Sequence, residues 1–350
     1  MKDLGSRSLE ILDAVVRLNI ETGRPVSSGL VERSLNRGIS SATIRSVMKG
    51  LEGAGYLDQP HISAGRLPTD TGFRVFVDRL QAGWSLRRID IPAQVRQVLG
   101  RNIKDPIDSQ ERVKVLAQLL SRLTDNISII LGPSWDEVKA VRVEAYPRSA
   151  RLMLMVVILD NSRVRTGLVE LAEDHAPAII EQAAAILTER IRGRTVAEIR
   201  GGCWESPDLL RTPASCCAAA LSRAGRNLFH DLGEGELELE GVANVLDEPE
   251  FREPEPLKAL LRFIESPRNI RRSLDRLGSM DDGRFGVWIG SENPVGPLRG
   301  FTVLTGRFEL DGRPGTLAVL GPRRMSYQRA FQGIEIMRYL AREQTKREAS

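Results

Sequence analysis

The chain has 350 residues, of which 41% are hydrophobic, and its formal net charge is +4 from 50 Lys and Arg against 46 Asp and Glu. This length predicts two or three domains, and the apolar content is typical of a globular protein. The longest purely apolar run, Leu152–Leu159, is far shorter than the roughly 18 residues that predict a membrane-spanning helix. No segment is therefore predicted to cross a membrane as a helix.

The N-terminal stretch carries Asp3, Glu10 and Asp13 and has no apolar segment of the kind found in an export signal. Its three cysteines, Cys203, Cys216 and Cys217, form neither a disulfide framework nor a Cys-x-x-Cys pair. A reducing, cytoplasmic location is therefore predicted. Cys216 and Cys217 lie beside an alanine run, and we expect both to be small buried apolar residues.

Two helices are predicted at the start of the chain. Ser6–Thr22 carries apolar residues on a broad face, and Gly23 and Pro25 end it. Ser27 or Ser28 begins a short second helix, which Gly38 breaks. A short helix, a tight turn and a further helix follow one another in helix-turn-helix proteins.

The third helix begins at Ser40 or Ser41, because a serine hydroxyl can accept a hydrogen bond from an unpaired N–H of the first turn. Its apolar positions fall on one stripe, and Gly55 occupies the place of a left-handed C-terminal cap. The stripe consists of Ile44, Val47, Met48 and Leu51, and the opposite side of Ala42, Thr43, Arg45, Ser46 and Lys49. Small and basic side chains suit a helix that enters the major groove of DNA, although a solvated polar face has the same composition.

A brief strand at Tyr56-Leu57 and a loop over Pro60–Arg66 follow this helix. The loop carries His61, Ser63 and Arg66. Arginine in such a loop can reach a phosphate or the negative minor groove, whereas a lone histidine is more often an ordinary turn residue. A fourth helix begins at Thr69 or Thr71. The predicted DNA-binding residues are Ser40, Ser41, Thr43, Arg45, Ser46, Lys49, His61, Ser63 and Arg66.

The excess of positive charge lies in this segment. Residues 1–100 hold 14 Lys and Arg against 10 Asp and Glu, and the rest of the chain is balanced. Because a surplus of four charges gives only weak attraction to phosphates, tight binding would require two copies of the chain to bind together.

Strands are predicted next, and helices interrupt them. An amphipathic helix near Arg112–Leu123 precedes strands at Ile127–Leu131, Val138–Ala145, Leu152–Leu159 and Val164–Leu171. Alanine-rich helices cover Ala176–Ile191 and Ala214–Leu228, and strands return at Phe285–Ile289, Phe301–Thr305 and Thr316–Leu320 before a last helix over about Tyr327–Glu343. This order predicts an α+β sheet domain with a helical insertion at about 172–255.

Several motifs resemble those of the bacterial heat-inducible transcription repressor HrcA family. They are Thr22–Ser28, Ser40–Arg45, Gly55–Asp70 with Gly72-Phe-Arg and Val77-Asp78, Glu240–Leu246 with Pro249–Phe251, Ile289–Asn293 and Leu320–Tyr327. The Gly55–Asp70 stretch is specific, and the resemblance extends over essentially the full length. Gly50 and Gly53 depart from a strong helix-forming sequence, since each glycine inside a helix costs roughly 0.5–1 kcal/mol.

The resemblance implies an α+β multidomain protein with an N-terminal winged helix-turn-helix domain at 1–82 and a helical connector at 83–125. A GAF-like α/β domain at 126–171 plus 256–345 would carry an inserted dimerisation region at 172–255. The family represses chaperone operons at an inverted-repeat operator in double-stranded DNA, and the chaperonin keeps the repressor active. The resemblance also implies a homodimer, which stripes such as Ile180, Ala183, Leu187 and Ile191 would form unless they pack within one chain.

Two other classes of function compete with this one. A GAF-like domain that binds a small ligand would make the chain a metabolite-sensing winged-helix regulator. An enzyme is disfavoured because the sequence has no phosphate-binding loop, no His-Glu-x-x-His and no Gly-x-Ser-x-Gly. The three histidines, His61, His175 and His230, lack the spacing of metal ligands. We therefore expect no catalytic residue, no metal and no cofactor.

Overall fold

The computed structural model describes residues 4–36, 38–61, 64–84, 109–160, 164–204, 212–233, 235–246, 248, 254–278 and 285–348. The chain forms two compact units, Met1–Gly132 with Leu237–Ser350 and Pro133–Glu236. It contains helices and antiparallel sheets in both units, so the predicted mixture of α and β structure is confirmed.

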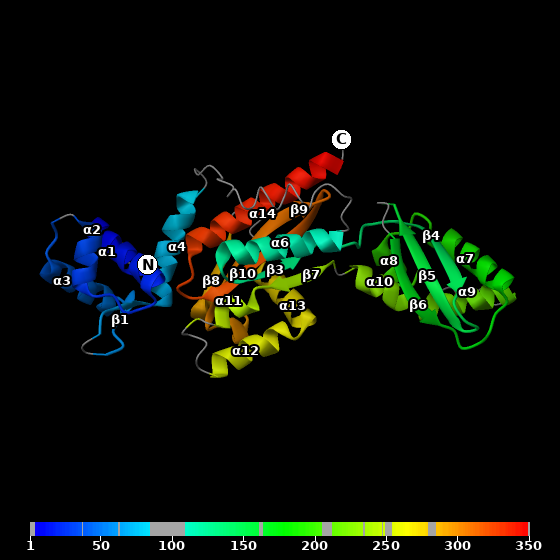
Figure 1. Ribbon diagram of the computed structural model, residues 1–350, viewed down its shortest axis with the longest axis horizontal. Helices are drawn as coiled ribbons and strands as arrows, with labels where there is room; N and C mark the ends of the chain where they lie inside the picture. Colours follow the sequence, from blue (N-terminus) through cyan, green and yellow to red (C-terminus); the bar gives the residue numbers. More distant parts are fainter. Residues whose placement is uncertain are drawn as a thin grey trace. The chain divides into compact units, whose positions relative to one another are not determined.

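The first unit begins with a small group of helices and a short hairpin (Figure 1). Its elements are α1 (Ser6–Thr22), α2 (Ser28–Leu35), α3 (Ser41–Gly53), β1 (Leu57–Asp58), β2 (Leu67–Pro68) and α4 (Asp70–Ala82). The two strands pair antiparallel. Ile11 and Val15 of α1, Ile44 of α3 and Phe73 of α4 are buried in one core, so the predicted apolar stripes do face one another.

Glycines set the path of the chain after α3. Gly55 has a φ of +81°, and the N–H groups of Gly55 and Tyr56 donate to the carbonyls of Glu52 and Leu51. This is the Schellman arrangement, in which the left-handed residue favours glycine, and it confirms the predicted cap. Gly72 lies against the hairpin, because a Cβ there would be 2.2 Å from the carbonyl oxygen of Tyr56.

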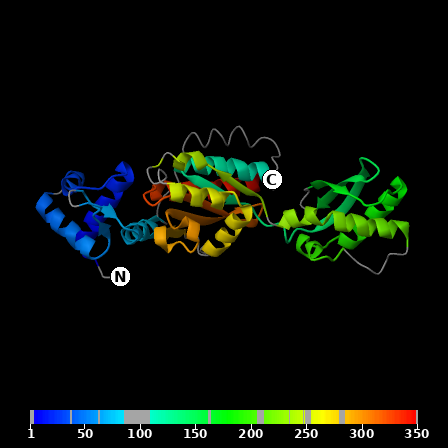
Figure 2. The same ribbon diagram turned by 90° about the horizontal axis from the view of Figure 1, so that it is seen from below.

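The rest of the first unit is a five-stranded antiparallel sheet between two layers of helices (Figures 1 and 2). Its strands, in spatial order, are β7 (Leu237–Glu240), β3 (Ile127–Leu131), β10 (Arg313–Pro322), β9 (Phe301–Leu310) and β8 (Gly286–Ile289). Side chains of α6 (Ser109–Thr124) and α14 (Tyr327–Glu348) share one core with this sheet, and those of α12 (Pro254–Ile264) and α13 (Pro267–Leu277) share another. Short helices α11 (Val242–Leu246), η4 (Gly290–Glu292) and η5 (Gly296–Leu298) complete it.

The second unit is a three-stranded antiparallel meander with helices on one face. It contains β4 (Ala140–Pro147), β5 (Leu152–Leu159), β6 (Val164–Glu170), α7 (Pro177–Ile191), α8 (Val196–Arg200), α9 (Pro213–Ala224) and α10 (Arg226–Gly233). Met155 and Val157 of β5 point into the core with Ile180 and Leu187 of α7. Leu221 of α9 joins them.

The domain boundaries drawn from the sequence were wrong in two places. Residues 126–171 do not form one sheet, because β4, β5 and β6 pair only with one another and belong to the second unit. Conversely, β7, placed in the insertion at 172–255, pairs with β3. The described part of the 83–125 connector, α6, packs on the five-stranded sheet, and residues 85–108 lie outside the described chain. Apolar side chains that alternate along the sequence identify a strand, but they do not identify the strand with which it pairs.

The cysteine prediction was half right. Cys217 is buried on α9, and burial raises the pKa of its thiol to about 11. Cys216 is exposed, because neighbouring residues on a helix point in different directions.

The backbone of the edge strand β4 is completed by a side chain of α7. The hydroxyl of Thr188 accepts a hydrogen bond from the N–H of Val143 and donates one to its carbonyl, both at 3.0 Å. Thr188 and Val143 are buried, so this one hydroxyl satisfies two backbone groups that would otherwise lack partners.

Alanine at Gly72 should destabilise the first unit, and alanine at Gly50 should stabilise it. The Cβ of Gly72→Ala meets a backbone oxygen that cannot move aside, and such overpacking costs about 1–3 kcal/mol. Gly50 lies exposed inside α3, and a Cβ added there would meet no atom within 4 Å, so Gly50→Ala should gain about 0.5–1 kcal/mol. Urea unfolding followed by circular dichroism measures both, and equal midpoints would contradict the expectation.

Replacing Thr188 by valine should destabilise the second unit. The change leaves the N–H and carbonyl of Val143 buried without partners, at a cost of about 1–3 kcal/mol. Thr188→Ser keeps the hydroxyl and is the matched control. Urea unfolding in which both variants behave alike would show that the hydrogen bonds contribute nothing.

Candidate nucleic-acid interface

Serine hydroxyls define the ends and the mutual position of α2 and α3. Ser27 caps α2, and Ser40 caps α3 by accepting a hydrogen bond from the N–H of Thr43 at 3.3 Å. The hydroxyls of Ser28 and Ser41 lie 2.9 Å apart and link the first turn of one helix to the first turn of the other. The two helices are therefore joined by polar contacts at the turn and by apolar contacts in the core.

The side of α3 that was predicted to meet DNA is exposed. Thr43, Arg45, Ser46 and Lys49 are exposed, whereas Ile44, Met48 and Leu51 are buried. Ser40 is exposed at the cap, and its hydroxyl also lies 3.0 Å from that of Thr43. Ser41 is half-buried because of its contact with Ser28, which makes it a structural residue of the turn.

Arg45 and Lys49 lie one turn apart on this exposed side. Neither forms an ion pair with another residue of the described chain. Two unpaired cations at positions i and i+4 repel each other slightly, and an anionic partner would remove that cost.

The loop of the hairpin is fastened to the connection between α1 and α2. Val26 and Arg66 exchange both backbone hydrogen bonds, at 2.8 and 2.9 Å. Gly65 permits this approach, because a Cβ there would lie 2.4 Å from the carbonyl oxygen of Val26. His61 is exposed at the other end of the loop, and Ser63 lies outside the described residues.

The side chain of Arg66 does not extend freely from the loop, contrary to expectation. Its Nε and Nη2 contact Oε2 of Glu52 at 3.0 and 2.9 Å, and the side chain is 17% exposed. Glu52 belongs to the last turn of α3, so this pair holds the loop against that helix. Sequence spacing could not show the pair, because the tertiary fold brings together residues 14 positions apart.

Arg33 was not among the predicted residues, although it is exposed on α2. The feature of the sequence that could have identified it is a basic residue in the last turn of the short helix.

Other kinds of site receive no support from the described residues. No group of three or more His, Cys, Asp or Glu side chains among them is arranged to hold a metal ion. None of the described helices has the length and apolarity that a membrane span requires.

Known proteins resemble this chain along nearly its whole length. The family model for the HrcA protein C terminal domain matches residues 110–331. The heat-inducible transcription repressor HrcA of Desulfitobacterium hafniense is 31% identical over 338 residues, covering 95% of both chains. That of Chlorobium phaeobacteroides is 29% identical over 355 residues, covering 96% of both.

A solved structure has the same fold. The crystal structure of a hypothetical protein superimposes with a TM-score of 0.69 at 27% identity and covers 98% of this chain and 99% of its own. Together with the family model and the two relatives, it agrees with the motifs noted in the sequence. The chain belongs to the HrcA family of heat-inducible transcription repressors.

Proposed function

We propose that the chain represses transcription by binding an inverted-repeat operator in double-stranded DNA, with α3 as the reading helix in the major groove. The observation that carries this proposal is the exposed side of α3, where Thr43, Arg45, Ser46 and Lys49 project from a helix whose other side is buried. Arginine can hydrogen-bond a guanine edge through two N–H groups, and the threonine methyl can contact a thymine methyl.

The hairpin serves as the wing of a winged-helix domain in this proposal. His61 lies exposed in its loop, and Ser63 follows two residues later in the sequence. Arg66 acts through Glu52, since that ion pair holds the loop against α3. We therefore assign Arg66 a positioning role and propose Arg33 and Lys49 as phosphate contacts.

We also propose that the repressor is a homodimer, and that its interface is the outer face of the three-stranded sheet. Side chains at Leu152, Leu154, Val156 and Ile158 of β5 are only half-buried there. Leu168 and Val164 of β6 are 63% and 57% exposed. Antiparallel sheets usually present polar side chains to water, so an apolar outer face on these strands favours a partner.

A second copy of the chain suits this face. Arg142 and Glu144 lie on it, two residues apart on β4, and form an ion pair with each other within one chain. Under two-fold symmetry the same patch meets itself, so each charge can approach its opposite in the other copy. The alanine-rich stripe Ile180–Ile191 is used instead to pack α7 onto the sheet of its own unit.

Membership of the family supports the remaining parts of the proposal. The five-stranded antiparallel sheet domain is proposed to be GAF-like, and the chaperonin to be the partner that keeps the repressor active. Heat would then reduce operator occupancy when unfolded proteins divert the chaperonin. The groove of about 580 Å³ that could suit the alternative, a metabolite sensor, lies between β4 and α7 in the second unit and has a mixed lining of Arg and Glu.

Replacing Arg45 should reduce sequence discrimination. Arg45→Ala should bring the affinities for the operator and for a scrambled duplex closer by roughly 1–3 kcal/mol if the guanidinium contacts a base. Arg33→Ala is the comparison, because loss of a phosphate contact weakens binding to both duplexes alike. Gel-shift titrations at several salt concentrations measure this, and equal losses for Arg45→Ala on both duplexes would remove it from base reading.

A charge on the outer sheet face should dissociate the dimer. Leu168→Lys places an ammonium in the proposed interface at a residue that is 63% exposed within one chain, so the fold should tolerate it. Sedimentation should then give a monomer, and binding to the full inverted repeat should fall by about 10²-fold or more as bivalence is lost. Gln182→Lys, exposed on α7, is the control. A wild-type chain that is already monomeric at micromolar concentration would rule out the dimer.

A further inference from the structure

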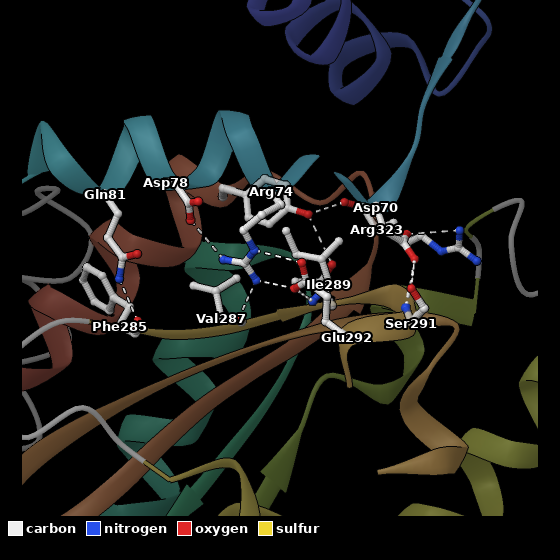
Figure 3. Close-up of polar contacts among 12 residues, drawn as sticks. Asp70, Arg74, Asp78, Gln81, Phe285, Val287, Ile289, Ser291, Glu292 and Arg323 are labelled. Carbon is white, nitrogen blue, oxygen red and sulfur yellow. Dashed lines mark hydrogen bonds and ion pairs between the residues drawn. The ribbon is translucent and has the colours of Figure 1, made fainter. Parts of the chain in front are cut away.

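Three sequence motifs that lie far apart in the chain meet on one helix. Asp70 and Arg74 are one turn apart on α4, and they contact the segment around η4 and the loop before α14 (Figure 3). Residues in the motifs Ile289–Asn293 and Leu320–Tyr327 supply these contacts. No role in reading DNA accounts for them.

Asp70 receives hydrogen bonds from the η4 segment. Its Oδ2 accepts from the N–H of Ser291 at 2.9 Å and from the hydroxyl of Ser291 at 2.8 Å, and Oδ1 lies 3.3 Å from Nη1 of Arg323. Gly290 makes room for the carboxylate, because it has a φ of +54° and a Cβ there would be 2.3 Å from Oδ1. The contact between α4 and the η4 segment therefore depends on the carboxylate of Asp70 and on the missing side chain of Gly290.

Arg74 makes the second set of contacts. Its guanidinium donates to both carboxylate oxygens of Glu292, to the carbonyl of Val287 at 2.6 Å, and to Asp78 at 3.2 Å. Oε2 of Glu292 also accepts from the N–H of Ile289 at 3.0 Å. A forked arginine–carboxylate contact has a specific geometry. Because both side chains are also held by other hydrogen bonds, this contact strongly restricts the direction of α4 relative to η4.

The same helix is joined firmly to the DNA-binding elements. Thr69 caps α4 by accepting from the N–H of Gly72, and its hydroxyl donates to the carbonyl of Gly55 at the end of α3. Arg79, on a later turn of α4, pairs with Asp13 of α1 at 2.6 Å. Because β2 leads directly into α4, any movement of α4 on the sheet domain carries α1, α3 and the hairpin with it.

We propose that Asp70 and Arg74 are positioning residues that set the direction in which α3 is held relative to the sheet domain, and thereby the operator half-site spacing that the dimer accepts. This inference rests on the proposed function. In a two-fold dimer the two reading helices must enter major grooves about one or more helical turns apart, so the angle at α4 decides which spacing allows both to bind.

The contacts suit positioning better than stabilisation. The side chains of Arg74 and Glu292 are 23% and 32% exposed, and pairs with this much exposure contribute modestly to folding. Their number and direction, however, leave few orientations of α4 in which Asp70 and Arg74 are both satisfied. Buried aromatic contacts of Phe73 and Phe76 with Tyr327 supply the apolar part of the same interface.

The test uses the full-length protein and three kinds of duplex. The wild-type chain first selects an inverted repeat from a randomised library. Binding is then measured to that repeat, to a duplex with one arm only, and to repeats whose spacer is longer or shorter by 1, 2 or about 5 base pairs, the last being about half a turn. The variants are Arg74→Gln, Glu292→Gln and the double variant. The control is Arg329→Gln, which makes the same change at an exposed ion pair with Asp125 outside this interface.

We expect each single variant to lose about tenfold in affinity for the selected repeat, within the range that bivalence contributes. The affinity of each variant for the duplex with one arm should stay within about twofold of the wild-type affinity, which is the usual error of such comparisons. The double variant should lose no more than either single one, and all three should show a weaker preference for the selected spacer. Arg329→Gln should leave the spacer preference unchanged.

Different failures have different meanings. Equal losses on the single arm and the full repeat, or an unchanged spacer preference in all variants, would overturn the positioning role while leaving the proposed function intact. Failure of the wild-type chain to select any repeat would reject the proposed function, and the positioning role with it. Thermal unfolding of every variant identifies any change that merely unfolds the domain, and Asp70→Asn then serves as the second variant.

Discussion

The burial of one stripe of α3 against α1 is the constraint from which the candidate interface follows. With Ile44, Met48 and Leu51 in the core, the helix has no freedom to rotate, and Thr43, Arg45 and Lys49 must lie outside. Each large apolar side chain buried in this way contributes about 1.5–3 kcal/mol, so three of them together outweigh a single polar contact on the other side. In the proposed function, DNA recognition by α3 therefore depends on an apolar core that faces away from the DNA.

The polar contacts around α3 have a different task. The Ser28–Ser41 and Arg66–Glu52 contacts each join α3 to a neighbouring segment. On α4, Asp70 and Arg74 join the same group of helices to the sheet domain. Burial by itself lowers the pKa of Arg74, but its hydrogen bonds with Glu292 and Asp78 outweigh this and raise the pKa. Arginine keeps its charge at any ordinary pH, and the raised pKa reflects the two carboxylates that hold its guanidinium.

The second unit illustrates how a strand can be apolar on both faces without being central to a large sheet. Alternate residues of β5 face the core, and the others remain half-buried on the outer face. Such a pattern is typical of strands covered on both sides, and among the residues that the structure describes only the core-facing side of β5 is covered. A second copy is the simplest cover, and it would also bring two reading helices to one operator.

The sequence by itself determined the local structure and which side of α3 is exposed. Caps and apolar periodicity predicted α1, α3, β3 and β5 with their observed bounds or nearly so, because these signals depend on residues within one or two turns. Helices α12 and α13 were not predicted from the sequence, and β4–β6 were assigned to the wrong sheet. The tertiary structure alone decided which strands share a sheet, that Arg66 pairs with Glu52, and that Asp70 and Arg74 meet the η4 segment. Those outcomes depend on contacts between residues up to about 220 positions apart, and an amphipathic pattern specifies that a face must be buried without specifying its partner.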